Sequence, residues 1–310
     1  MIEVVLHNGL NNRLLPFVSI LRLALKTNHK VNVVWTYTPV RSCIAYHGDL
    51  CKFNDLFKDV DNVTFDNPEK FDYQKNYEFK YWENKDHIID VSGNDNVFVN
   101  YALYTIVSTE DAQESIFVNL KRVIVEPRKF ELDYIGEELS EIFKKYIKPI
   151  DELQNEIDHY HKLFKKNMIG IHIRKSDGGF SHYNWNDIIK KLLSQSKNWC
   201  SNKDNGIFLA TDDKNVYVEF ASKLGNNLLF YNPPEVLNNT KSTSGPYDKF
   251  NNDKFNVLCG VVELFLLSKC NKYIIGTADS TFSVSAMIMA DKETEKYLIN
   301  DVSNLPEFSF

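Results

Sequence analysis

The pair His172 and Arg174 ends the apolar run IGIHIR and could bind an anion. Residues two apart on a strand project to the same face, so we expect the two side chains to lie together. An arginine fork beside an imidazole donor suits a diphosphate. A surface ion pair between Arg174 and Asp177 would account for the same residues without a ligand.

Two carboxylates follow the next apolar run, IFLAT. They are Asp212 and Asp213. Paired acids at the carboxyl end of a strand can hold a ribose, an arginine or a metal ion. They are equally common as N-caps of a following helix, and both interpretations stay open.

Glu263 is the only charge in the apolar segment NVLCGVVELFLL. Burial of a carboxylate without partners is costly, so this side chain must reach solvent or meet hydrogen-bond donors. Guanine offers two adjacent donors, N1–H and N2–H₂, which one carboxylate can accept together. An exposed helix edge, or an Arg or Lys partner elsewhere, is the alternative.

Two further polar segments lie at expected helix starts. In GTADSTFS, the hydroxyls of Ser280, Thr281 and Ser283 would join backbone N–H groups that a helix start leaves unpaired, which makes an anion site. In the glycine-rich loop, Gly9 allows close backbone approach, and three side chains supply donors for sugar hydroxyls or phosphate. These three are Asn11, Asn12 and Arg13. A simple turn would explain this loop as well.

The elements that must position these clusters alternate between strand and helix. In the second half, we expect strands at 168–174, 206–211, 227–231 and 273–276, and helices at 184–200, 215–224, 256–268 and 282–290. In the first half, we expect strands at 2–6, 31–35 and 97–107, helices at 14–26 and 111–120, and two charged helices over 133–166. Such alternation predicts parallel sheets flanked by helices, with ligands at the carboxyl ends of the strands.

Composition narrows the function classes. The formal net charge of −6 argues against broad binding to nucleic acid. Five cysteines without a CxxC pair predict neither a zinc site nor a disulfide framework, which fits a reducing compartment. The first residues lack the pattern of a signal peptide, and no window approaches the roughly 20 apolar residues of a membrane span. We therefore expect a cytoplasmic protein.

Three segments in order resemble the motifs of the GDP-fucose transferase superfamily, which contains core α1,6-, nodulation and protein O-fucosyltransferases. They are IGIHIRKSD, IFLATDDKNV and NVLCGVVELFLLSKCNKYIIGTADSTFSVSAMIM. GLNNRL is similar to the glycine-rich loop of that group. The resemblance implies an α/β fold of the GT-B class, with two Rossmann-like domains facing a cleft. The acceptor-side domain would span 1–150 and the nucleotide-sugar domain 151–310.

The resemblance also implies an inverting, metal-independent transfer that needs no cofactor. A nucleotide sugar, GDP-fucose, would be the donor and a glycan the acceptor. Arg174 matches the diphosphate-binding arginine, His172 the guanine- and phosphate-side histidine, and Glu263 an aspartate that reads guanine. The implied donor-binding set is His172, Asp212, Asp213, Glu263, Ser280, Thr281, Phe282 and Ser283.

The sequence departs from that pattern mainly on the acceptor side. Lys175 stands where the core α1,6 enzymes have a second arginine, and Gly178 replaces a lysine. His182 lies at the place of an acceptor-side glutamate, and Asn11 replaces a glycine.

A general base must accept the proton of the acceptor hydroxyl. His182 is the first candidate because imidazole titrates near neutrality, and Asp177 and His7 follow. The expected catalytic residues are thus Arg174 and His182.

Other functions remain open. The triplet Asp59-Val60-Asp61 would be the DxD motif of a metal-dependent GT-A transferase, although its charged, turn-like surroundings are typical of a solvated loop. A transferase using another nucleotide sugar, or a non-catalytic binder of nucleotide or glycan, would share the donor motifs. Neither GxGxxG nor GxxxxGK[ST] is present, which disfavours a dehydrogenase or an NTPase.

Overall fold

The fold is known from a computed structural model. It describes residues 2–6, 9–35, 51–66, 97–101, 105–107, 117–119, 134–175, 183–231, 254–278 and 280–309. The described residues form two compact units. The first contains those up to residue 150 together with Lys254, and the second contains 151–231 and 255–309.

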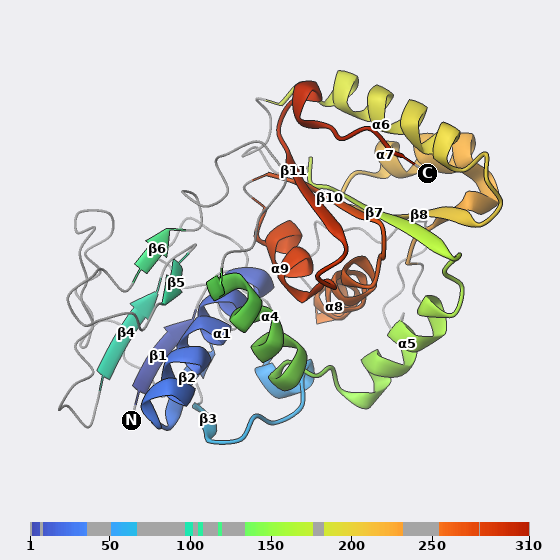
Figure 1. Cartoon of the computed structure of the whole chain (residues 1–310). Coiled ribbons are helices and arrows are strands. Elements are labelled where there is room, and N and C mark those ends of the chain that lie inside the picture. The colour runs from blue at the N-terminus through green and yellow to red at the C-terminus, as the bar shows by residue number, and fades with distance from the viewer. Residues whose placement is uncertain are drawn as a thin grey trace. The chain divides into compact units, whose positions relative to one another are not determined.

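The first unit is built on a parallel sheet with the strand order β3-β2-β1-β4 (Figure 1). The strands are β1 (Ile2–Leu6), β2 (Val31–Trp35), β3 (Val63–Asp66) and β4 (Val97–Tyr101). A short antiparallel pair accompanies them, formed by β5 (Thr105–Val107) and β6 (Phe117–Asn119). The helices are α1 (Leu10–Thr27) and α4 (Tyr134–Tyr146). An ion pair between Arg22 and Glu138 joins these two helices.

Aromatic side chains fill the core of the first unit. Phe53 stacks on Phe65 of β3 with ring centroids 4.2 Å apart. The rings of Phe17 from α1 and Trp35 from β2 meet Phe53 edge to face. Part of the high aromatic content therefore serves packing.

The second unit contains a five-stranded parallel sheet with the order β11-β10-β7-β8-β9. Its strands are β7 (Asn167–Ile173), β8 (Asn205–Thr211), β9 (Leu228–Leu229), β10 (Tyr273–Thr277) and β11 (Glu295–Ile299). Its helices are α5 (Asp151–His161), α6 (Trp185–Trp199), α7 (Lys214–Leu224), α8 (Lys254–Ser268) and α9 (Thr281–Met289).

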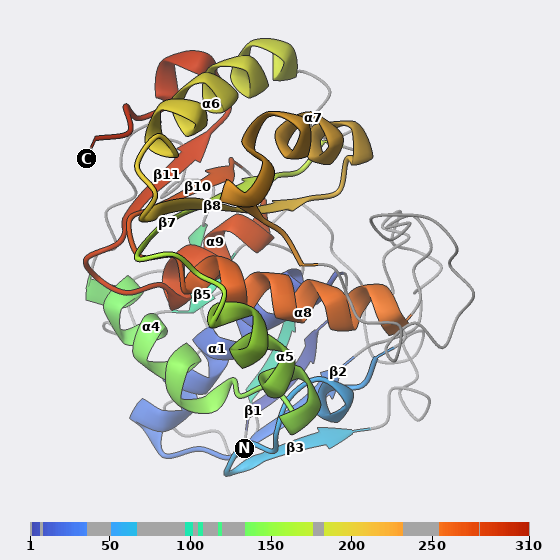
Figure 2. The same ribbon diagram turned by 90° about the vertical axis from the view of Figure 1, so that its right-hand side faces the viewer.

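The path of the chain through this sheet changes direction once. It starts at the central strand β7, moves outward through β8 and β9, and then returns to the other side of β7 with β10 and β11. Helices α6 and α7 cover one face and α8 and α9 the other (Figure 2). The carboxyl ends of β7 and β10 therefore flank a topological switch point, which is where open α/β sheets bind ligands.

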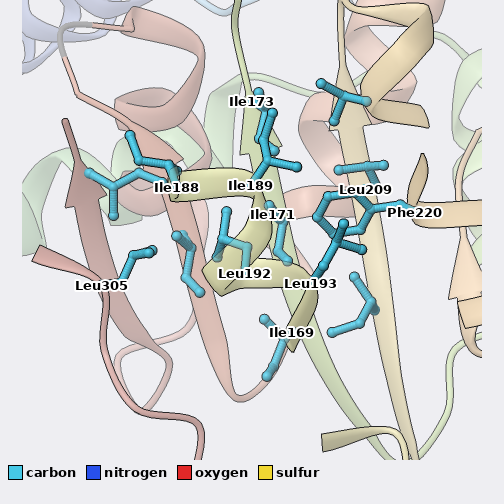
Figure 3. Packing of buried hydrophobic residues seen from close by; sticks show 14 of the residues in the cluster. Ile169, Ile171, Ile173, Ile188, Ile189, Leu192, Leu193, Leu209, Phe220 and Leu305 are labelled. Carbon is cyan, nitrogen blue, oxygen red and sulfur yellow. The ribbon is translucent and has the colours of Figure 1, made fainter. Parts of the chain in front are cut away.

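Side chains of strand β7 point alternately to the two faces of the sheet, so one set enters the core and the other set faces the site. Ile169, Ile171 and Ile173 project to the face covered by α6, where they pack with residues such as Ile188 and Leu192 (Figure 3). The residues between them must face α8 and α9.

Most of the expected elements are present. The prediction of a helix over 111–120 is wrong in the part of that segment that the structure describes. Phe117–Asn119 form strand β6 instead, because Phe117 and Val118 favour an extended backbone and pair with β5. The single strand expected over 97–107 is two strands, β4 and β5. Helix α1 begins at Leu10, four residues earlier than expected. Strands β3 and β11 were not expected.

No helix within the described ranges is long and apolar enough to cross a membrane.

Candidate functional site

His172, on the α8/α9 face of β7, is held by residues of the segment that follows β10. Its Nδ1 lies 2.7 Å from Oγ of Ser283. Its ring stacks on Phe282, with centroids 4.6 Å apart and an interplanar angle of 27°. The imidazole is only 6% exposed. Two residues of α9 therefore fix both the plane and one nitrogen of this ring.

Thr277 joins the ends of β7 and β10. Its buried hydroxyl donates to the carbonyl oxygen of His172 at 3.1 Å and accepts the backbone N–H of Arg174 at 3.0 Å. The last paired residues of the two strands are Gly276 and His172. Beyond this pair, the Thr277 side chain keeps the ends of the two strands connected. Arg174 leaves the sheet here with a half-buried side chain.

Helix α9 begins at the same place. Ser280 is its N-cap, with an extended backbone and no capping hydrogen bond from its side chain. The first N–H groups of a helix have no acceptor inside the helix, and the helix dipole adds partial positive charge. No acidic residue lies in the first turn of α9. Together with the Arg174 cation, this end of the sheet favours an anion.

Glu263 lies on α8, which packs on the same face of the sheet as His172. Leu267, one turn later, reaches the close approach at Gly170 of β7, where an added Cβ would lie 2.6 Å from its Cδ1. One helical turn is about 5.4 Å and two strand residues span about 6.6 Å. Because α8 runs back against the strands, Glu263 lies near the level of His172. Its side chain is 6% exposed.

The surroundings of Glu263 include Tyr231, which follows β9. Burial raises the pKa of the Tyr231 phenol, and the nearby Cys259, Glu156 and Glu263 act in the same direction. The Tyr231 hydroxyl is buried and has no hydrogen-bond partner among the described residues. Glu263 therefore lies in a region where charge is poorly solvated.

The acidic pair after β8 is engaged by Lys175. Asp212 Oδ1 accepts the backbone N–H of Lys175 at 2.8 Å, and the Lys175 ammonium lies 3.0 Å from Oδ2 of Asp213. Asp213 Oδ1 also accepts the backbone N–H groups of Asn215 and Val216 and so caps α7. These contacts favour the capping interpretation for Asp213, and a donor-binding role for the pair stays a prediction.

The glycine-rich loop is largely the first turn of α1, with Gly9 as N-cap. Arg13 is fully buried and lies over the Trp35 ring, 4.3 Å from its centroid. Burial lowers the pKa of Arg13 to about 9, although the nearby Cys51 raises it. Asn11 is buried and Asn12 half-buried. The Arg13 guanidinium thus packs inside the first unit against Trp35, and ligand binding by these residues stays a prediction.

Several expected site residues lie outside the described residues: Asp177, Gly178 and His182, and also His7. Asp59 and Asp61 are described and exposed. They flank the turn before β3, and Asp59 accepts a hydrogen bond from Asn54. This placement agrees with a solvated turn.

The segment GTADSTFS that the sequence indicates as an anion site begins with Gly276 and Thr277, but sequence reasoning gave these two residues no role of their own. Thr277 is the last residue of the buried strand β10. A hydroxyl at a strand end can form the backbone hydrogen bond that the sheet no longer supplies there, so this residue type could have indicated a link between strand ends. Gly276 allows Ser283 to approach, since an added Cβ would lie 2.5 Å from Cβ of Ser283. The close approach of Ser283 to Gly276 depends on how α9 packs against β10, and no local sequence pattern indicates it.

Solved structures share this architecture. NodZ α-1,6-fucosyltransferase soaked with GDP-fucose matches with a TM-score of 0.53 and 14% identity, over 93% of this chain and 92% of that chain. A mutant of FUT1 from Arabidopsis thaliana in complex with GDP matches with a TM-score of 0.52 and 12% identity, over 94% of this chain and 71% of that chain. POFUT1 in complex with GDP matches with a TM-score of 0.50 and 9% identity, over 96% of this chain and 97% of that chain.

The chain has the GT-B fold of known fucosyltransferases. The GT-B fold that the resemblance implied is therefore confirmed. No protein-family model matches the sequence, and no curated protein matches it. What this fold can catalyse therefore depends on the residues of its site.

Proposed function

We propose that this GT-B chain is a glycosyltransferase that takes GDP-fucose as donor and a glycan hydroxyl as acceptor. The observation that carries the proposal is the convergence of His172, Arg174 and the start of α9 at the switch point between β7 and β10. A diphosphate requires positive charge and several N–H or O–H donors in one place, and these groups supply both. The fucosyltransferase NodZ, which shares the fold, was soaked with GDP-fucose.

The proposed reaction is a direct displacement that inverts the anomeric carbon. As the bond to the β-phosphate breaks, the sugar acquires oxocarbenium character and negative charge grows on the phosphate. The fixed charge of Arg174 and the dipoles of α9 stabilise that charge without reorganisation. The acceptor oxygen attacks from the opposite side while a base removes its proton, and His182 is our first candidate for the base.

Glu263 is proposed to read the guanine. Its position on α8, near the level of His172, supports this role, since one carboxylate can accept guanine N1–H and N2–H₂ together. We expect calorimetry to show tighter binding of GDP than of UDP. Glu263→Gln should lose about 1.5–3 kcal/mol of GDP affinity, the usual value of a hydrogen bond to a charged group. UDP affinity is the internal control and should not change. Equal GDP affinity of both proteins would refute the guanine-reading role.

Two alternatives share the same site: another nucleotide sugar as donor, and nucleotide binding without turnover. A thermal-shift panel of GDP, UDP, dTDP and their sugars separates the donors, because a bound ligand raises the unfolding temperature by mass action. Product formation with GDP-fucose and a glycan then separates an enzyme from a binder.

A further inference from the structure

The turn between β10 and α9 is fastened to both strands that neighbour β10 in the sheet. The Thr277 hydroxyl links it to the backbone of β7. The next residue, Ala278, donates its backbone N–H to the carbonyl oxygen of Ile299 at the end of β11, at 2.8 Å. Ser280, the N-cap of α9, donates its N–H to the carbonyl oxygen of Thr277 at 3.3 Å. The start of α9 is therefore built directly on the ends of these strands.

Tyr183 fastens the same turn from the face of the sheet that α6 covers. Its ring centroid lies 5.4 Å from that of Trp185, and both side chains belong to the hydrophobic cluster on that face (Figure 3). Its hydroxyl donates to the carbonyl oxygen of Ala278 at 3.2 Å. Among the described residues, Tyr183 is the donor to this oxygen, and Ala278 is itself only 7% exposed.

The hydroxyl of Tyr183 does what the ring alone cannot do. A phenylalanine would fill the same space in the cluster, whereas a buried phenol hydroxyl is costly unless it has a hydrogen-bond partner. A buried carbonyl oxygen that loses its donor, in turn, destabilises the conformation that buries it. The hydrogen bond between Tyr183 and Ala278 therefore favours one position of the turn, and with it one position of the first N–H groups of α9.

We propose that Tyr183 is a positioning residue of the donor site, whose hydroxyl holds the start of α9 ready for the diphosphate before the nucleotide sugar binds. Tyr183 acts through Ala278 and not by contact with the donor. The proposal rests on the proposed function, because it gives Tyr183 a part in that site. Dipoles fixed in advance stabilise a charged group without reorganisation, whereas a loose turn must be ordered by the ligand at a cost in affinity.

Tyr273 provides a matched control. It is the first residue of β10, at the opposite end of that strand from Thr277, and it belongs to the same hydrophobic cluster as Tyr183. Tyr273 is 6% exposed and Tyr183 is 7% exposed. The Tyr273 hydroxyl is hydrogen-bonded to Oγ of Ser309 at 2.9 Å. Tyr183→Phe and Tyr273→Phe thus each remove one hydrogen-bonded hydroxyl from the same core, so a general loss of stability should appear in both variants.

Amide hydrogen exchange examines the turn without any ligand. The N–H of Ala278 is bonded to the end of β11, and the N–H of Val284 is bonded to the N-cap of α9. Both amides therefore report whether this turn stays closed. Tyr183→Phe should speed their exchange about fivefold more than Tyr273→Phe does, which is the factor that one neutral hydrogen bond contributes. Equal exchange rates in the two variants would overturn the proposal.

Calorimetry with GDP and with guanosine tests the link to the donor site. Guanosine lacks the diphosphate, so only GDP can use the start of α9. Tyr183→Phe should bind GDP about fivefold more weakly than the wild type does but guanosine with unchanged affinity. Tyr273→Phe should bind both ligands as the wild type does. An equal loss of affinity for both ligands in Tyr183→Phe would show a merely structural role and refute the proposal.

The outcome of this experiment also separates the inference from the proposed function. A wild type that binds GDP, with unchanged GDP affinity in Tyr183→Phe, would overturn only the role of Tyr183. A wild type that binds no GDP would overturn the proposed function and with it the donor-site role of Tyr183, whatever the exchange rates show.

Discussion

Arg174 is the side chain on which the proposed chemistry depends most, because it brings a full positive charge to the end of β7. We expect Arg174→Lys to be nearly as damaging as Arg174→Ala. Lysine keeps the charge but cannot present two parallel donors to a departing phosphate. Loss of such a group from a transition state typically lowers the rate by about 10²–10³. Steady-state kinetics of transfer measure it, and kcat should fall as well as kcat/KM.

Circular dichroism shows whether each Arg174 variant folds. Lys197→Ala, in the last turn of α6, controls for the loss of one exposed positive charge. A near-normal kcat in Arg174→Ala would remove this residue from the chemical step. A change in KM alone would leave it as a binding residue.

At the level of single residues, the sequence indicates which side chains are unusual but not what they contact. Glu263 stands out because it is one charge in an apolar helix, and alternation along β7 places His172 and Arg174 on one face. The partner of His172 is 111 residues away. No local pattern indicates that Ser283, rather than Ser280, reaches the ring, because the choice depends on how α9 packs against Gly276.

At the level of elements, Asp213 links the start of α7 to β7. Burial alone would raise the pKa of Asp213, but hydrogen bonds from Lys175, Val216 and Asn215 hold it below its ordinary 3.8. We expect Asp213→Ala to lower the free energy of unfolding by about 1 kcal/mol at neutral pH, as for loss of other N-caps.

The effect of Asp213 should depend on pH. Because the folded-state pKa of Asp213 is lowered, its stabilisation is present above the ordinary pKa of an unfolded Asp and is lost as the pH falls through the folded value. Urea denaturation of wild type and variant at pH 7 and in stronger acid measures the difference. A difference that is equal at both pH values would contradict an ionised cap.

The sequence predicts most elements of the second unit, because strands β7, β8 and β10 are largely apolar runs and helices α6 and α7 each have an apolar face. The first unit is less predictable. In β6, Phe117 and Val118 are too few to reveal a strand, and the pairing with β5 decides their conformation. Strand β11 alternates only briefly, and its place beside β10 is a tertiary effect.

At the level of the whole molecule, the fold and the site together make a prediction about metals. We expect sugar transfer to proceed without loss of rate in EDTA, because Arg174 and the start of α9 supply the charge that the departing diphosphate requires. The measurement compares rates in EDTA and in manganese. If manganese restored a lost rate, and if replacing Asp59 and Asp61 by Asn abolished that rescue, a metal-dependent reaction through these exposed carboxylates would replace the proposed one.

The central position of β7 also has a consequence for motion. This strand is hydrogen-bonded to β10 on one side and β8 on the other, whereas β9 and β11 are edges. Amides of 169–173 should therefore exchange with deuterium only through global unfolding, and those of 228–229 through local opening. His172 would then keep its place while the edges of the sheet fray. If the amides of β7 exchanged as fast as those of β9, the site itself would undergo local opening.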